Sequence, residues 1–311
     1  MEYIIMKFME NTKINFMAYK SFGFAISSIL AVGSIIVLLT GINLGIDFKG
    51  GTAVGVSFSE EISIQEVRAS LKNVSVENKI YDLSGEEIKY FGEKNDIMIK
   101  IKSLDNQPEN FGQIVINHLY DSLNEKAPKD KNEFILSLGS VSPKVGSELS
   151  GKALWSVISA LVLILFYISV RFEFKFALGA ILALIHDVVI TLGVFSLTGY
   201  EITLSTVAAF LTIVGYSLND TIVILDRIRE NMKSSGTVMF EATINKSINQ
   251  SLSRTLITSL TTLLVIMVLL IYGGEVIRPF SFTMLVGVII GTYSSIYIAS
   301  ALLAYIYQNS K

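Results

Sequence analysis

The chain has 311 residues, of which 51% are hydrophobic and only 17% are charged, whereas soluble chains carry roughly 25% charged residues. This composition, with a mean hydropathy of +0.56, excludes an ordinary soluble protein. A net charge of -2 leaves no basic excess for nucleic acid, and the absence of cysteine excludes disulfides and thiolate metal sites.

Six apolar runs are each long enough to cross a hydrocarbon core of about 30 Å, which takes roughly 20 helical residues. We expect membrane-spanning helices at 22–45, 153–171, 176–198, 203–225, 254–272 and 281–305. The other segments are 1–21, a polar block at 46–152, an amphipathic loop at 226–253 and a tail at 306–311. Because the polar block holds 30 of the 52 charged residues, we predict an α-helical polytopic membrane protein with one external domain after its first helix.

The basic residues predict how the chain crosses the membrane, because short cytoplasmic loops carry an excess of Lys and Arg. Eleven lie in the N-terminal segment, the second-to-third and fourth-to-fifth loops and the tail, whereas the opposite short loops contain only Arg278. We therefore expect both termini in the cytoplasm and the 46–152 domain outside it. The first helix is too long for a signal-peptide core and lacks an A-x-A-like exit, which favours an uncleaved anchor.

The polar block has the pattern of an α+β domain. Residues 52–58 alternate like a strand. Ser63 and Glu66 form a capping box that opens an amphipathic helix, with Val67, Leu71 and Val74 on one face. Strands at 78–82, 87–91 and 96–102, a helix from Phe111 to Leu123 and a strand near 133–141 follow. This β-α-β-β-α-β arrangement is that of ferredoxin-like folds.

Two features of this block resemble sites without meeting their requirements. His118 has no cysteine or nearby histidine as a partner, so we expect it on a helix surface rather than in a metal site. Gly146–Ala153 resembles a phosphate-binding loop, but Ala153 replaces the hydroxyl residue that would bind Mg²⁺. We therefore expect a polar lead into the second membrane helix, and no metal or other cofactor.

Two carboxylates lie within predicted spans, where an acid costs about 2.5 to 3.5 kcal/mol on insertion scales. Asp187 lies about 11 residues into the third span, beside His186, and Asp220 lies six residues before the Asp226–Arg227 boundary of the fourth. The small and polar face that carries Asp220 also includes Ser205, Ala209, Thr212, Tyr216 and Asn219. Such a face is expected to lie inside a helix bundle.

Arg254, at the start of the fifth span, is the candidate counter-charge for Asp220, and a stripe of threonines follows it at helical spacing. Two interpretations remain open. In the first, Asp220 and Arg254 form a static salt bridge while Asp187 hydrogen-bonds Thr191. In the second, Asp187, Asn219, Asp220 and Arg254 form a proton relay, because a carboxylate between a cation and a desolvating environment is poised to exchange a proton.

Later segments suggest how the helices pack. Phe240, Ile244, Ile248 and Leu252 form an amphipathic run that we expect along the cytoplasmic interface. In the sixth span Gly287, Gly291, Ser295 and Ala299 recur at every fourth position, a row that lets another helix approach closely. Packing within the chain explains this row as well as a partner does. Transporters often contain two related bundles, and since the sequence contains one, we expect a partner chain.

GIDFKGGT, Gly45 to Thr52, resembles the signature of the SecD/SecF family of the bacterial Sec export machinery. In it, Asp47 marks the membrane interface, Phe48 can insert there, and Gly50 and Gly51 permit a tight entry into a strand. LIHDVVITLG, TIVGYSLNDTIVILDRIRENM, LSRTLITSLTTL and GTYSSIYIASAL resemble the SecF branch in the same order. The resemblance therefore covers nearly the whole chain.

The resemblance implies a member of the resistance-nodulation-division superfamily in the bacterial cytoplasmic (inner) membrane, forming half of a twelve-helix unit with SecD. It implies association with the SecYEG channel and YajC, an indirect link to SecA, and use of the proton-motive force to promote export of unfolded polypeptide. Protons would be the coupling ion, without a cofactor. By motif it assigns Asp220 and Arg254 to proton conduction and marks Asp187 as a recurrent acid.

Two other functions remain as alternatives. An exporter half for small molecules or lipids would usually have two large external loops, and a translocon scaffold without energy coupling would not need Asp220. An intramembrane hydrolase is not expected, because the chain has two histidines, no cysteine and no G-x-S-x-G. An aspartyl dyad needs both carboxylates within a few ångströms, whereas the estimated depths of Asp187 and Asp220 differ by roughly 8 Å. We therefore expect no enzyme activity.

Overall fold

The computed structural model describes residues 12–76, 79–104, 107–108, 110–171, 174–235 and 240–308. The chain divides into two compact units. One contains the chain up to Asn43 and from Ser156 onward, and the other runs from Leu44 to Trp155. Each unit has its own hydrophobic core.

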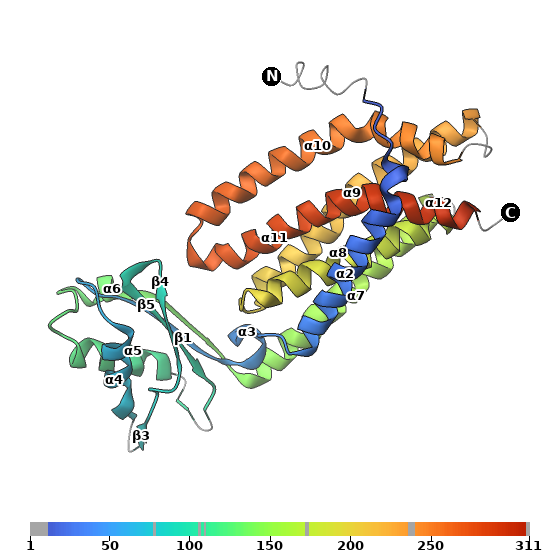
Figure 1. Ribbon diagram of the computed structural model, residues 1–311. Helices are drawn as coiled ribbons and strands as arrows, with labels where there is room; N and C mark the ends of the chain where they lie inside the picture. The colour runs from blue at the N-terminus through green and yellow to red at the C-terminus, as the bar shows by residue number, and fades with distance from the viewer. Residues whose placement is uncertain are drawn as a thin grey trace. The chain divides into compact units, whose positions relative to one another are not determined.

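The first unit is helical (Figure 1). Its elements are η1 (Phe16–Tyr19), α2 (Lys20–Leu39), the end of α7 (Pro143–Arg171), α8 (Phe174–Leu197), α9 (Leu204–Ser235), α10 (Phe240–Tyr272), α11 (Gly274–Ser294), the π-helical turn η3 (Ser295–Ala299) and α12 (Ser300–Gln308). Within the described residues, six segments are long and apolar enough to cross a membrane, the last running from Gly274 to Tyr307. The predicted polytopic helical fold is therefore confirmed.

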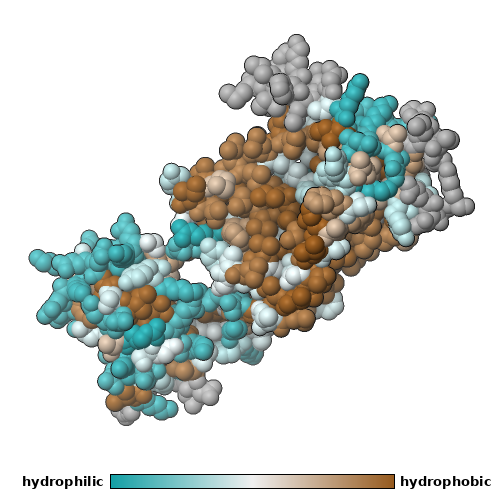
Figure 2. Space-filling model, in the orientation of Figure 1, coloured by the Kyte–Doolittle hydropathy of each residue, from teal (hydrophilic) through white to brown (hydrophobic). Residues whose placement is uncertain are grey.

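Helices α8, α9 and α11 form the centre of this unit, with α2 packed against α8 and α10 packed against α9 and α11. The outer helices α2, α7 and α10 expose large apolar side chains. Figure 2 shows these hydrophobic side chains as a nearly continuous surface over the helical unit, whereas the other unit is mostly hydrophilic. Such a surface is favourable when lipid is the solvent, because lipid tails are as apolar as the side chains.

The segment expected as an amphipathic loop, 226–253, is largely helical. Helix α9 continues to Ser235, and α10 begins at Phe240 and runs for 33 residues without interruption, about 50 Å at 1.5 Å per residue. The apolar side of the amphipathic run is buried, since its four residues belong to the main hydrophobic core of the unit: Phe240, Ile244, Ile248 and Leu252. Its apolar side therefore packs against the rest of the helical unit. No Gly or Pro interrupts residues 240–272, so nothing in the chain ends the helix at the membrane boundary.

The row of small residues on the sixth span packs within the chain. A Cβ added at Gly287 would lie 2.3 Å from Cδ1 of Ile213, and one added at Gly291 would lie 3.0 Å from Cβ of Ser217, both on α9. Ser295 and Ala299 are also completely buried. These small residues allow α11 and α9 to approach closely at the centre of the unit.

The second unit contains a four-stranded antiparallel sheet in the order β4-β5-β1-β6. Its strands are β1 (Gly51–Ser57), β4 (Glu87–Phe91), β5 (Glu93–Lys102) and β6 (Ile135–Val141), and its main helices are α4 (Ile64–Ser70) and α5 (Phe111–Ser122). Smaller elements are α3 (Ile46–Lys49), η2 (Leu71–Asn73) and α6 (Lys131–Phe134). Because β5 lies between β4 and β1, the β-α-β connection is split, as ferredoxin-like folds require. The predicted α+β fold of this domain is confirmed.

Two details of this domain differ from the sequence prediction. Val74 is not on the first helix, which ends at Ser70. It belongs instead to the strand β2 (Val74–Val76), which pairs with β3 (Lys79–Tyr81) as a separate two-stranded sheet. The alternation of Val74 and Val76, both buried around an exposed Ser75, favours a strand over a third helical turn.

The two rejected sites have structural roles. His118, half-buried on α5, places Nε2 at 2.9 Å from the carbonyl oxygen of Ser70, and so links the two main helices of the domain. Gly146–Ala153 is helical throughout and lies within α7, where Lys152 pairs with Glu148 at 2.7 Å. A continuous helix does not present the row of backbone N–H groups that cradles phosphate in a phosphate-binding loop.

Candidate functional site

Asp187 is a completely buried carboxylate on α8 that holds three helices together. Its Oδ2 accepts hydrogen bonds from Ser217 on α9 (2.5 Å) and from Ser294 on α11 (2.7 Å). Its Oδ1 lies 2.8 Å from Nδ1 of His186. The carboxylate therefore joins the central helices α8, α9 and α11 at one point.

This arrangement contradicts the expected hydrogen bond between Asp187 and Thr191. The Oγ1 atom of Thr191 is buried and has no hydrogen-bond partner in the described part of the chain, and the same is true of Nε2 of His186. The carboxylate of Asp187 is directed sideways to the neighbouring helices instead of along its own. A threonine one turn away on the same helix cannot provide this link between helices.

Asp220 on α9 is the second buried carboxylate, with 2% of its surface exposed. Ser259 on α10 donates a hydrogen bond to its Oδ2 over 3.4 Å, and the Ser259 hydroxyl lies 2.8 Å from that of Thr292 on α11. Neutral hydroxyl groups from α10 and α11 thus lie next to Asp220 in the central bundle. Such groups can donate to a carboxylate and accept from a carboxylic acid, so they suit both protonation states.

Arg254 is exposed and does not form the salt bridge of the first interpretation. Among the ion pairs of the described residues, none joins it to Asp220 within 4.0 Å. It lies on α10 five residues before Ser259, which is about 7.5 Å along the helix axis. Its charge is nevertheless within electrostatic reach of Asp220. The structure brings these groups near each other without direct contact.

The two carboxylates are linked through the helices that they share. Ser217, a partner of Asp187, precedes Asp220 by three residues on α9, and on α11 Thr292 precedes Ser294 by two. A rotation or shift of α9 against α11 would therefore alter the surroundings of both carboxylates. Each hydroxyl partner lies on a different helix from its carboxylate, so the periodicity of a single span does not identify it.

The expected small and polar face of α9 is divided between the inside and the outside of the unit. Ala209 is completely buried, and the Tyr216 hydroxyl is buried without a hydrogen-bond partner among described residues. Ser205, Thr212 and Asn219 are exposed. Ala208 and Gly215 are exposed between them, so the outward stripe repeats every three or four residues from Ser205 to Asn219. Only part of this face is therefore buried within this chain, because one helix cannot turn so wide a surface toward a single neighbour.

The GIDFKGGT segment forms the entrance to the second unit. Its turn α3 leads to Gly50 and Gly51, whose φ angles of 76° and 143° favour glycine. A Cβ on Gly50 would lie 2.8 Å from Cα of Pro143 at the start of α7, and one on Gly51 would lie 2.6 Å from the Ile101 carbonyl oxygen. The two glycines therefore allow the first residues of β1, the strand β5 and the start of α7 to converge.

Phe48 is buried in this turn, next to Asp47 at the start of α3. A Cβ on Gly146 of α7 would lie 2.8 Å from the Phe48 carbonyl oxygen. The segment after Gly45 thus packs closely on the first turn of α7. Its function in this unit is structural, and no three His, Asp or Glu side chains of the described residues cluster as a metal site would require.

The chain matches two family models. Residues 121–309 match the model described as protein export membrane protein SecD/SecF, C-terminal, and residues 35–61 match the SecD/SecF GG motif. The second match covers the glycine turn at Gly50 and Gly51, and the first covers both buried carboxylates. The glycine turn and the two buried carboxylates therefore all lie within matched segments.

Full-length relatives are also similar. The chain is 42% identical to the protein translocase subunit SecF of Calditerrivibrio nitroreducens over 298 residues, with 94% of this chain and 93% of the relative covered. It is 38% identical to SecF of Escherichia coli O157:H7 over 303 residues, with 97% and 90% covered. These matches extend through both units.

Two solved structures have the same fold. The crystal structure of SecDF from Thermus thermophilus, described as a translocon-associated membrane protein, matches with a TM-score of 0.81 and 37% identity. A crystal structure of SecDF in a super-membrane-facing form matches with a TM-score of 0.68 and 36% identity. The matches cover 96% of this chain but only 39% and 40% of the solved chains, so this chain spans about two fifths of each.

Proposed function

This multi-pass membrane chain belongs to the SecD/SecF family of protein export membrane proteins, in its SecF group, and on this premise we propose that it couples the proton-motive force to protein export. The observation that carries the proposal is the position of Asp220. This carboxylate is buried in a membrane-spanning helix among hydroxyl groups, with a cation nearby but not in contact. A static structural ion pair would require that contact.

The chemistry follows from the two protonation states of Asp220. The protonated acid is neutral, suits the buried position and can remain hydrogen-bonded to Ser259. The ionised form is costly in this environment and gains most by approaching Arg254, so loss of the proton favours a shift of α9 relative to α10. Each charge that crosses the membrane potential yields about 2.3 kcal/mol per 100 mV. That energy can bias a two-state helix bundle.

Asp187 has a different proposed role in this relay. Its hydrogen bonds to Ser217 and Ser294 hold α8, α9 and α11 in one arrangement. Since Ser217 lies one turn from Asp220, the Asp187 cluster would transmit a shift of α9 to the rest of the bundle. Asn219 is exposed beside Asp220. Its side-chain amide has both a donor and an acceptor, so it can bridge Asp220 and a group on the outward surface of α9.

The partner that fits the outward surface is SecD. Ser205, Ala208, Thr212, Gly215 and Asn219 form an exposed stripe of small and polar residues on a membrane-spanning helix. Small residues permit close approach of another helix, and transport sites lie at the interface of paired bundles. Because this chain spans 39% of a solved SecDF chain, a second bundle against this stripe accounts for much of the remainder.

The proposed setting is the bacterial cytoplasmic (inner) membrane, with both termini in the cytoplasm and the second unit outside. The distribution of basic residues supports this orientation. There the complex would associate with the SecYEG channel and YajC, with SecA linked indirectly, and the external domain would meet unfolded exported polypeptide. No cofactor is required, because protons act as the coupling ion.

The test is export into proteoliposomes that contain SecYEG, SecD and this chain, with and without a proton gradient. Asp220→Asn should abolish the stimulation by the gradient while the complex still assembles. Asp226→Asn is the matched control, since Asp226 lies near the end of the same span with its side chain 45% exposed. Unchanged stimulation in Asp220→Asn would favour the alternative role of a scaffold without energy coupling.

A further inference from the structure

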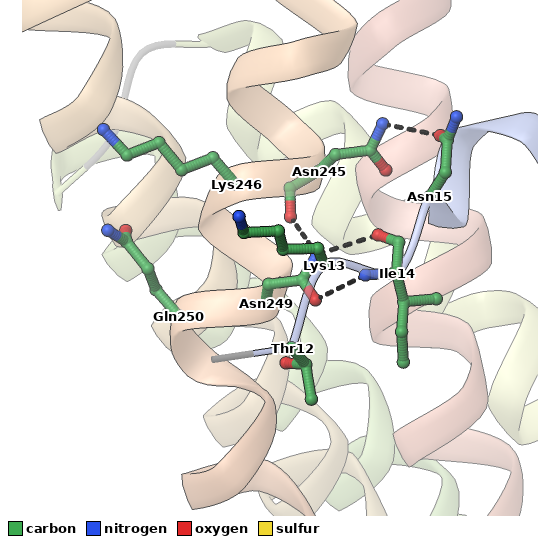
Figure 3. Close-up of a pocket in the computed structure, with 8 residues that line it drawn as sticks. All are labelled: Thr12, Lys13, Ile14, Asn15, Asn245, Lys246, Asn249 and Gln250. Atoms are coloured by element: carbon green, nitrogen blue, oxygen red, sulfur yellow. Dashed lines mark hydrogen bonds between the residues drawn. The ribbon is translucent and has the colours of Figure 1, made fainter. Parts of the chain in front are cut away.

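A cavity of about 330 Å³ lies where the segment before the first span crosses the N-terminal part of α10 (Figure 3). One wall consists of residues 12–15, and the other consists of Asn245, Lys246, Asn249 and Gln250. All of these residues belong to the helical unit. The cavity is separate from the buried carboxylates, and the proposed function does not use it.

Hydrogen bonds from two asparagines hold the walls together. The Asn249 side chain accepts from the Ile14 N–H (2.9 Å) and donates to the Ile14 carbonyl oxygen (2.8 Å), as a neighbouring strand would. One turn earlier, Oδ1 of Asn245 accepts from the Met17 N–H at 3.0 Å. These bonds, drawn in part in Figure 3, fix the backbone next to Lys13 against α10. The cavity is therefore preformed.

Three side chains that line the cavity offer hydrogen-bond donors, namely Lys13, Lys246 and Gln250. Lys13 and Lys246 form no ion pair within the described residues, whereas the nearby Lys20 is neutralised by Glu241. Gln250 accepts a hydrogen bond from Asn231 at 2.8 Å through Oε1, so its amide N–H groups are left to donate. No Asp or Glu is among the described residues that line the cavity. The cavity thus presents two positive charges and an amide donor.

We propose that this cavity binds a phosphate-bearing anion, supplied by the headgroup of an anionic phospholipid or by free phosphate. Two lysines and an amide match the oxygen acceptors of a phosphate group. Lys13 lies three residues before the apolar segment Phe16–Leu39, and phospholipid headgroups lie at the ends of membrane-spanning segments. A bound anion would join the N-terminal segment to α10, on which Arg254 lies about two turns after Lys246.

The experiment is native mass spectrometry of the full chain in detergent micelles doped with phosphatidylglycerol or, in a parallel arm, with phosphatidylcholine. The wild type should retain phosphatidylglycerol in preference to phosphatidylcholine. Lys13→Gln and Lys246→Gln should each weaken retention about fivefold. Lys13→Arg and Lys246→Arg should preserve it, which separates loss of charge from misfolding. Lys233→Gln is the matched control, because Lys233 is an exposed lysine at the end of α9.

A competition with inorganic phosphate distinguishes the two sources. If millimolar phosphate leaves the phosphatidylglycerol adduct intact, the lipid headgroup is the ligand; if phosphate displaces it and binds the wild type but not the Gln variants, free phosphate is the ligand. Equal retention by wild type and both Gln variants would overturn the proposal. Equal weakening by Lys233→Gln would overturn it as well, because the effect would then reflect net charge alone.

Discussion

Ser294 donates a hydrogen bond to Asp187 over 2.7 Å, although 107 positions separate the two residues in the chain. The bond joins the last residue of α11 to the middle of α8. It lies immediately before the π-helical turn η3, where the hydrogen-bonding pattern of the sixth span changes. Changes of this type inside helices are frequent at functional sites, so the end of α11 is a natural place to test.

Removal of either serine partner should destabilise the helical unit. Ser294→Ala and Ser217→Ala each leave the buried Asp187 carboxylate with one donor fewer, and we expect a loss of about 1 kcal/mol for each. Thermal unfolding in detergent measures this loss. Ser295→Ala is the control, because its hydroxyl bonds only to a carbonyl oxygen of its own helix. If Ser294→Ala had the same unfolding midpoint as Ser295→Ala, the hydrogen bond from Ser294 to Asp187 would not stabilise the unit.

Arg254 should act on Asp220 through its charge. We expect Arg254→Gln to lose the stimulation of export by the proton gradient, as Asp220→Asn does, and Arg254→Lys to retain much of it, because no direct contact has to be matched. Export assays in proteoliposomes test this prediction. In a static salt bridge, by contrast, the double variant Asp220→Asn with Arg254→Gln would restore what each single variant loses. Recovery of stimulation in the double variant would therefore contradict the relay.

Gly287 should not tolerate a side chain. Gly287→Ala places a methyl group against Ile213 and should cost about 1 to 3 kcal/mol, because inserted methyl groups force a packed core to shift. A second change, Ile213→Ala, should recover part of the loss by making room. Gly33→Ala is the control, since a Cβ there meets nothing within 4 Å. Thermal unfolding of the wild type and these three variants tests the prediction, and equal midpoints for Gly287→Ala and Gly33→Ala would refute close packing.

Gly51 should be required by the second unit, Leu44–Trp155. Gly51→Ala combines a φ of 143° with a Cβ only 2.6 Å from the Ile101 carbonyl oxygen, which is backbone and cannot move aside. We expect a loss of about 1 to 3 kcal/mol, the usual cost of such backbone strain. Limited proteolysis of the full chain should cut this domain faster than in the wild type. Gly139→Ala, where a Cβ meets nothing within 4 Å, should leave the rate unchanged.

The second unit, Leu44–Trp155, should lose stability in acid. Hydrogen bonds from Lys126 (2.5 Å) and Ser63 hold the pKa of Glu66 below its ordinary value of 4.5. A lowered folded pKa means that the unfolded state binds the proton more tightly, so this stability is present above pH 4.5 and lost as the pH falls through the folded pKa. Glu66→Gln should therefore flatten the pH dependence of unfolding below pH 4.5. A slope equal to that of the wild type would show that Glu66 contributes nothing there.

Local patterns were sufficient for much of the fold. Apolar length predicted six spans, and strand alternation with the Ser63–Glu66 capping box predicted the β-α-β-β-α-β order of the second unit. In both cases the signal lies in residues close together in the chain, where periodicity reports directly on a helix or strand. The segment 240–252 shows the limit, because its apolar periodicity is the same whether the helix lies on a membrane or packs into a core.

For the buried acids, the sequence by itself determined that Asp187 and Asp220 lie within apolar spans, since a carboxylate in such a run is visible without any structure. Only the tertiary structure decided their partners. Asp187 bonds Ser217 and Ser294, 30 and 107 positions away, and not the nearby Thr191. The rotation and axial register of neighbouring helices set these contacts, and neither is encoded in the periodicity of one helix. The same register leaves Arg254 near Asp220 but out of contact with it.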